Sequence, residues 1–164
     1  MDYTVRKARP DDLPRIEEIY AIAREFMEQT GNPNQWGKTY PPHEWLVDDI
    51  EQGLLYVITA EDAIHGVFYF YIGADSTYAS IEDGAWRYDI PYGTIHRIAS
   101  DGSGAILRTA VAFCSEMSDY IRIDTHHDNI VMQKAVSKLG FERSGIIRLA
   151  NGDPRIAYEL YIQK

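Results

Sequence analysis

Three polar side chains of this sequence have the chemistry of a general acid or base. His96 lies in a predicted strand, and Asp124 and His126 lie where a later predicted strand ends. An imidazole with an ordinary pKa of about 6.5 accepts a proton near neutral pH, and a nearby carboxylate can orient the ring or relay its proton. The sequence also leaves structural roles open: His96 as a strand histidine bound to Asp or backbone, and Asp124 as a cap near the helix start at Asp128.

The histidines do not form a recognisable metal motif. His126 and Asp128 together with His96 offer suitable ligand types, but the sequence has no His-x₃-His, no His-Glu-x-x-His and no cysteine pair. We therefore expect no metal. The single cysteine, Cys114, falls on the apolar face of a predicted helix and is expected to be a core thiol rather than a nucleophile.

A turn rich in small residues, Ser100 to Gly104, is the second feature suited to chemistry. It follows an apolar strand and precedes a helix. Gly102 and Gly104 remove Cβ bulk where the backbone turns sharply, and residues 103–106 then offer free N–H groups at the positive end of the helix dipole. The turn predicts a cradle for a pyrophosphate, although glycines in this arrangement also serve plain tight turns. The inward residues of the helix are predicted to be Leu107, Ala110, Val111, Cys114 and Met117.

Hydrophobic periodicity places these residues on alternating strands and helices. The predicted order is a strand, two helices, three strands, a helix, a strand, a helix and two strands, which is typical of an α/β fold with a mixed sheet. The strands are expected at residues 3–8, 54–60, 64–72, 94–99, 120–124, 141–149 and 155–162. The turn at residues 61–63 predicts an antiparallel hairpin, Asp128 is predicted to cap the last helix, and Gly140 to end it.

Two of these segments resemble the GCN5-related N-acetyltransferases, the GNAT family. Residues 94–106 are similar to the family's acetyl-CoA-binding motif, and residues 124–141 are similar to the motif that follows it. Asn129 and Gly140-Phe141 stand where the family commonly has an Asn and a Gly-Phe. The strings His-Arg-Ile-Ala-Ser and Asp-Thr-His-x-Asp-Asn look like one bacterial-type subgroup.

The N-terminal segment TVRKARPDDLPRIEEIYAIA also resembles the start of many members, so the resemblance covers nearly the whole chain. It implies a single α/β domain of residues 1–164 with a mixed, mostly antiparallel sheet flanked by about four helices. It also implies a splayed central strand pair that binds the cofactor.

The resemblance implies acetyl-CoA as cosubstrate and a primary amine of a small molecule or peptide as acceptor, with direct transfer and no metal. His96 is the first candidate to take the amine's proton, because it shares a strand face with Ile98 and Ser100. Asp124 and His126 are candidates for a water-linked relay. The residues implied to bind the cofactor are Ile98, Ala99, Ser100, Gly102, Ser103, Gly104, Ala105, Ile106 and Asn129.

Two positions depart from the family's pattern. The turn at residues 100–105 is short and lacks the usual basic or Gln residue, so a pyrophosphate would depend on backbone amides, the Ser103 hydroxyl and Arg108. Val136 stands where many relatives have the tyrosine that protonates the leaving thiolate. Two alternatives therefore stay open: a non-catalytic acyl-CoA-binding regulator of the same fold, and an interaction protein that has lost the cofactor.

Composition limits the number of domains and the kinds of partner that this chain can have. With 164 residues, 45% of them hydrophobic, the chain fits one domain, and its formal charge of −9 without a basic stripe disfavours nucleic acid. The sequence has no apolar run of about 18 residues and no signal-peptide core, so we expect a cytoplasmic protein with no membrane partner. The acidity mildly favours a cationic substrate, and a homodimer stays open. Seven aromatic residues either border the implied acceptor groove or cover the core: Trp36, Tyr40, Trp45, Tyr78, Trp86, Tyr88 and Tyr92.

Overall fold

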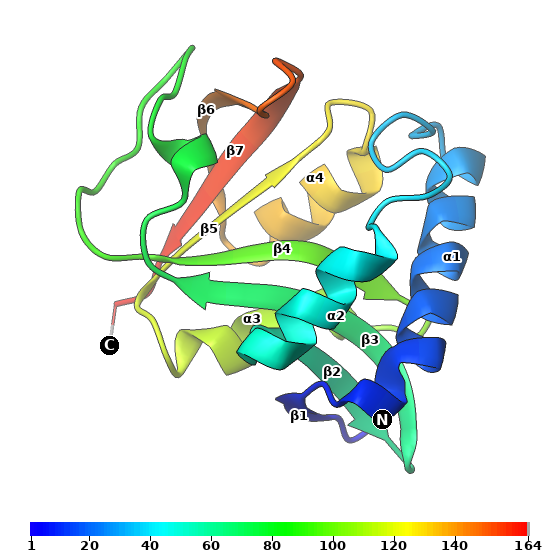
Figure 1. Ribbon diagram of the computed structural model, residues 1–164. Helices are drawn as coiled ribbons and strands as arrows, with labels where there is room; N and C mark the ends of the chain where they lie inside the picture. Colours follow the sequence, from blue (N-terminus) through cyan, green and yellow to red (C-terminus); the bar gives the residue numbers. More distant parts are fainter. Residues whose placement is uncertain (164) are drawn as a thin grey trace.

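One mixed sheet organises the fold (Figure 1). The computed structural model describes residues 1–163, so Lys164, the last residue of the predicted domain, lies outside the described residues. The strands are β1 (Thr4–Lys7), β2 (Leu55–Ala60), β3 (Ala63–Ile72), β4 (Gly93–Ser100), β5 (Tyr120–Thr125), β6 (Glu142–Arg148) and β7 (Pro154–Tyr161). The α-helices are α1 (Leu13–Gln29), α2 (His43–Gln52), α3 (Ile106–Ser115) and α4 (Ile130–Lys138). This order along the chain confirms the predicted order.

The sheet runs β1-β2-β3-β4-β5-β7-β6, and of these neighbours only β4 and β5 are parallel. Their pairing is limited to Gly93 with Ile121 and Thr94 with Arg122. Beyond these residues the two strands separate, and the gap widens toward the end of β4 (Figure 1). The predicted mixed, mostly antiparallel sheet with a splayed central pair is confirmed, and so is the antiparallel β2–β3 hairpin.

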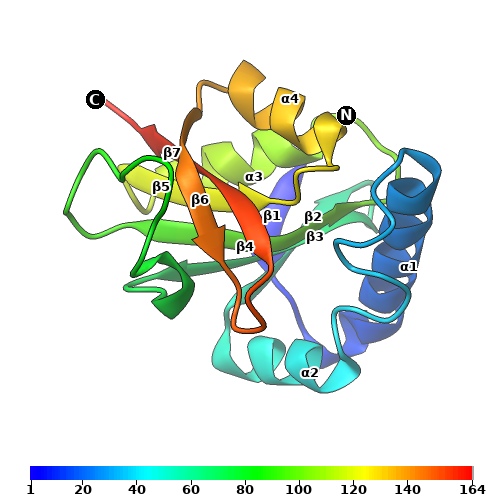
Figure 2. The same cartoon turned by 90° about the horizontal axis from the view of Figure 1, so that it is seen from above.

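Helices cover both faces of the sheet, with α1 and α2 on one side and α3 and α4 on the other (Figure 2). Helix α1 buries Ile16, Ile19, Tyr20 and Ala23, which lie on one face at helical spacing. Their core also takes in Leu46 of α2 and apolar residues of β2, β3 and β4. None of the helices formed by residues 1–163 is long and apolar enough to cross a membrane.

Helix α3 differs from its prediction at one end. Ile106, Ala110, Val111 and Cys114 are buried, but Met117 is 41% exposed because the helix stops at Ser115. Cys114 lies fully inside the core, where burial raises the pKa of its thiol, so the expectation of a core thiol is confirmed.

The start of α4 corrects a second prediction. Asn129, rather than Asp128, caps the helix, because its side-chain Oδ1 accepts from the Met132 N–H at 3.0 Å. The Asp128 N–H instead donates to Nδ1 of His126 at 3.0 Å. Both residue types cap helices well, so the sequence alone did not separate these adjacent positions.

The long segment between β3 and β4 packs over β5, β6 and β7. Its Glu82 pairs with Ile146 of β6 through two backbone hydrogen bonds. The guanidinium of Arg122, on β5, lies 3.9 Å from the ring centres of both Trp86 and Tyr92. The Tyr92 hydroxyl accepts from the Asp75 N–H at 2.8 Å, and this bond helps to hold the start of the segment beside β4.

Candidate functional site

A cavity of about 370 Å³ opens beside His96 on β4. Helix α2, strands β3 and β4, and the segment before β4 all contribute to its wall. The lining residues are Trp45, Asp48, Asp49, Tyr69, Asp75, His96 and Arg97. The cavity therefore combines a titratable ring with aromatic and acidic side chains.

His96 is held in place by a carboxylate that the sequence did not point to. Nε2 of His96 lies 2.8 Å from Oδ2 of Asp75, and the imidazole is 25% exposed. Burial raises the pKa of the Asp75 carboxyl, but hydrogen bonds from His96 and Thr77 outweigh burial and hold that pKa well below its usual range. Because an ionised carboxylate only accepts, the His96 proton sits on Nε2 and leaves Nδ1 as the acceptor in the neutral ring.

Asp124 faces the other nitrogen of the same ring. Its Oδ2 lies 3.9 Å from Nδ1 of His96 and accepts a hydrogen bond of 2.7 Å from the hydroxyl of Tyr78. Burial, and then the charge of Asp124, raise the pKa of Tyr78 well above its usual value, so this hydroxyl stays protonated. The structure thus brings together His96 and Asp124 and adds Asp75 and Tyr78 to them.

His126, the third predicted residue, lies apart from this group. Its ring is buried, its Nδ1 accepts from the Asp128 N–H, and burial lowers its pKa. Among residues 1–163 no hydrogen bond or ion pair joins it to His96 or Asp124. It lies instead beside His127 and Asp128, with candidate ligand atoms within 4.8 Å of one another. The rings of the two histidines stack at 4.3 Å, and Nδ1 of His126 is already engaged.

The turn after β4 carries free backbone donors. The N–H of Gly102 donates to the Ser100 hydroxyl and the N–H of Ser103 donates to Oδ1 of Asp101, so the expectation of a free Ser103 N–H is wrong. From Gly104 to Arg108, no N–H finds an acceptor within the described chain. A Cβ added at Gly102 or Gly104 would meet nothing within 4 Å, so the turn faces open space.

Side chains anchor this turn to the rest of the fold. Asp101 accepts from Arg15 of α1 at 3.0 Å and lies 2.9 Å from Nδ1 of His65 on β3. The Ser103 hydroxyl lies 3.2 Å from the same nitrogen of His65. Ala105, at the N-cap position of α3, takes a left-handed conformation with φ of 66° and makes no side-chain hydrogen bond to the first amides of the helix.

Asn129 connects two distant segments. Besides capping α4, its Nδ2 donates to Oε1 of Gln35 at 3.0 Å, and that oxygen also accepts from Asn32 and Thr125. The loop between α1 and α2 is therefore attached to the start of α4. Nothing local in the sequence around Gln35 indicated this contact.

Val136 and the aromatic residues singled out in the sequence lie partly in the core and partly at the surface. Val136 is 1% exposed and belongs to the core, so no side chain at this position protonates a leaving group. Of the seven aromatic residues, Tyr78 is buried, while Trp45 is 49% exposed at the cavity.

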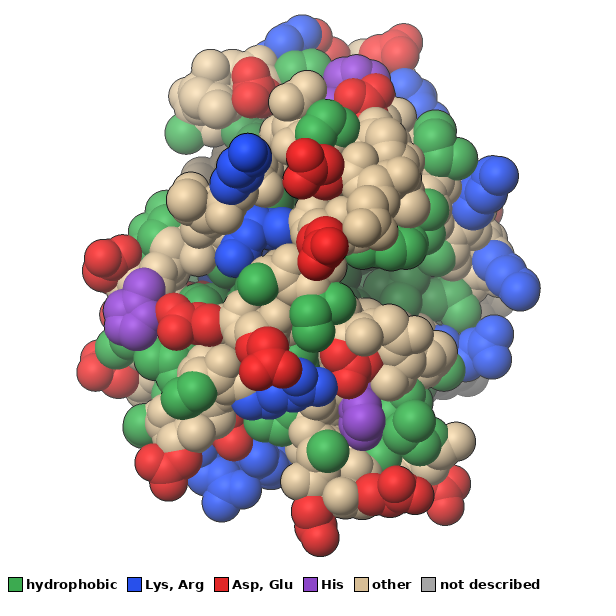
Figure 3. Space-filling model, turned by 90° about the vertical axis from the view of Figure 1, so that its right-hand side faces the viewer, with side chains coloured by type: hydrophobic (Ala, Val, Ile, Leu, Met, Phe, Trp, Pro, Cys, Tyr) green, Lys and Arg blue, Asp and Glu red, His purple; other side chains and the backbone are tan. Residues whose placement is uncertain are grey.

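Figure 3 views the molecule from the side toward which β4 and β5 diverge, and shows a recess with hydrophobic side chains at depth. Basic side chains are scattered over that face rather than gathered.

Comparison with known proteins identifies the fold. No family model matches the sequence, and no curated protein matches it. A GNAT-family acetyltransferase from Streptococcus agalactiae superposes with a TM-score of 0.90 at 28% identity, over 99% of this chain and 96% of that one. A GNAT-family acetyltransferase from Listeria monocytogenes gives a TM-score of 0.71 at 18% identity, over 98% and 95%. The NatC complex bound to Gag peptide and CoA gives 0.58 at 13% identity, over 99% and 100%. The chain has the GNAT fold.

Proposed function

We propose that this protein is a GNAT-family N-acetyltransferase that moves an acetyl group from acetyl-CoA to a primary amine. The observation that carries the proposal is His96, oriented by Asp75 at the wall of a cavity, on the strand that leads into a turn with free amides. The acetyltransferases that share the fold support the same reaction class.

The chain offers a fitting site for the cofactor. The amides from Gly104 to Arg108 lie at the start of α3, where free N–H groups and the helix dipole favour a pyrophosphate. Because β5 separates from β4, the edge of β4 that faces β5 is unpaired at residues 98–100. This edge is available to pair with the extended, amide-containing arm of acetyl-CoA. These features support the predicted cofactor residues on and after β4, and acetyl-CoA would supply the reactive thioester.

His96 has the geometry of a general base. The amine must be neutral when its nitrogen forms the new C–N bond and the C–S bond breaks, and Nδ1 of His96 is the free acceptor for its proton. The carboxylates of Asp75 and Asp124 lie on either side of the ring and stabilise the imidazolium that results. Tyr78 holds Asp124 in position through its hydroxyl.

The buried Val136 favours one other candidate, a non-catalytic regulator that binds acyl-CoA with the same fold. Thiol detection with a panel of primary amines separates the two. The enzyme releases CoA thiol in an amine-dependent manner, and His96→Ala suppresses that release. A regulator is stabilised against thermal unfolding by CoA, but it releases no thiol with any amine.

A further inference from the structure

The cavity beside His96 has an acidic excess. It contains three carboxylates: Asp49 forms an ion pair with Arg97, and Asp75 accepts a hydrogen bond from the neutral ring of His96. Asp48 lies on the exposed rim, and its Oδ2 accepts a hydrogen bond of 2.7 Å from Nε2 of Gln52, a neutral side chain. Arg97, the one Lys or Arg side chain that lines the cavity, therefore faces three carboxylates, and the charge of Asp48 has no cationic partner among residues 1–163.

An exposed aromatic ring lies on the same helix. Trp45 stands three residues before Asp48 on α2, so both side chains project on one side of the helix. The guanidinium of Arg97 lies 5.8 Å from the Trp45 ring centre, and Trp45 as a residue is still 49% exposed. An exposed indole beside an unpaired carboxylate is a favourable setting for an ammonium group.

The cavity has room for a small molecule. A volume of about 370 Å³ is near the lower end of small-molecule sites, which span roughly 300–1,000 Å³. Building on the proposed function, we propose that the acceptor is a small amine with a second cationic group, such as a terminal diamine. One amine reacts at His96, and the other, as ammonium, lies against Asp48 and Trp45. The products are the monoacetylated diamine and CoA thiol.

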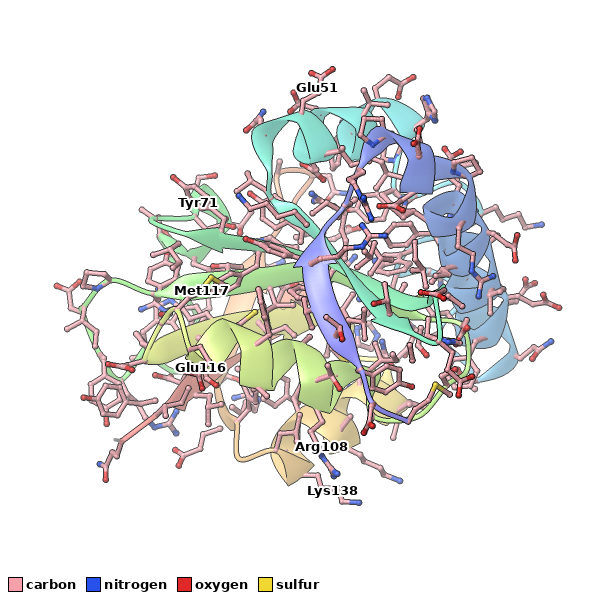
Figure 4. The ribbon with its side chains drawn as sticks, turned by 90° about the horizontal axis from the view of Figure 1, so that it is seen from below. Glu51, Tyr71, Arg108, Glu116, Met117 and Lys138 are labelled. Atoms are coloured by element: carbon pink, nitrogen blue, oxygen red, sulfur yellow. The ribbon has the colours of Figure 1, made fainter. Side chains whose placement is uncertain are left out.

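Two probes of equal chain length test the second charge. With 1,4-diaminobutane and n-butylamine, kcat/KM from thiol release should favour the diamine by about tenfold, since only the diamine gains both an ion pair and a cation–π contact. Asp48→Asn should lower this preference about threefold or more, because it removes the unpaired charge. Glu51→Gln is the matched control, since Glu51 is on the same helix but points away from the molecule (Figure 4). It should leave the preference unchanged.

The outcomes separate this inference from the proposed function. Equal use of the two amines, or an equal effect of Asp48→Asn and Glu51→Gln, overturns the diamine assignment while acetyl transfer stands. If neither amine is acetylated, calorimetric titration of 1,4-diaminobutane decides. Binding that Asp48→Asn weakens and Glu51→Gln does not supports the diamine site, and no binding overturns it.

Discussion

Replacing Asp75 by Asn tests how the structure orients His96. The change keeps the size of the side chain and the Oδ1 atom that accepts from the Thr77 N–H at 3.0 Å, so the local turn is preserved. It removes the charge that accepts from Nε2 of His96. An amide group that presents its own N–H to Nε2 favours the other tautomer, in which the proton occupies Nδ1 and the acceptor is lost.

The expected loss of activity follows from the hydrogen bond between Asp75 and His96. A hydrogen bond to a charged group contributes about 1.5–3 kcal/mol, and a positioned general base contributes roughly 10²-fold or more in rate. Asp75→Asn should therefore lower kcat by about 10²-fold, with little change in CoA affinity.

Stability gives an independent readout with a defined sign. The pKa of Asp75 is held below its unfolded value, so its contribution to stability is fully present above pH of about 4 and is lost as pH falls through the folded pKa. Asp75→Asn should therefore lower the free energy of unfolding at pH 7, measured by urea denaturation. Asp89→Asn, an exposed substitution in the same segment, is the control. Wild-type kcat in a folded Asp75→Asn protein would refute the orienting role.

Three further substitutions test the roles of His96, Gly104 and Asn129. His96→Ala should cut kcat by roughly 10²-fold or more and abolish the acidic limb while leaving CoA binding intact; an unchanged profile would make His96 a packing residue. Gly104→Val should weaken CoA binding at least tenfold, about 1.4 kcal/mol by calorimetry, with a smaller change in Tm, and unaltered affinity would place the pyrophosphate elsewhere. Asn129→Ala should lower the free energy of unfolding by about 1 kcal/mol, because α4 loses its cap, and a stability equal to wild type would show that the cap contributes nothing.

The fold was largely predictable because its signals are local. Apolar spacing located the strands and helices, and small residues between Ser100 and Gly104 located the turn into α3. The errors are local too. Met117 continues the apolar pattern past the end of α3, and the α4 cap shifted by one residue between two good capping types.

The candidate site was only partly predictable, because its contacts span the chain. The partners of His96 and Asp124 are Asp75 and Tyr78, which lie 21 and 46 residues away from them. Gln35 meets Asn129 across 94 residues. No periodicity or spacing encodes such pairs. For Asp75 the sequence holds only the signal of an Asp at the start of a Ser-Thr-Tyr turn, which accounts for its cap and not for its histidine.

Mass spectrometry of the reaction with acetyl-CoA and 1,4-diaminobutane shows directly whether this protein transfers an acetyl group to an amine. We predict monoacetylated diamine and CoA thiol in equal amounts, at a rate that depends on His96. Saturable CoA binding without any acetylated product, from this diamine or from a broad panel of primary amines, would contradict it and identify the chain as a binding protein.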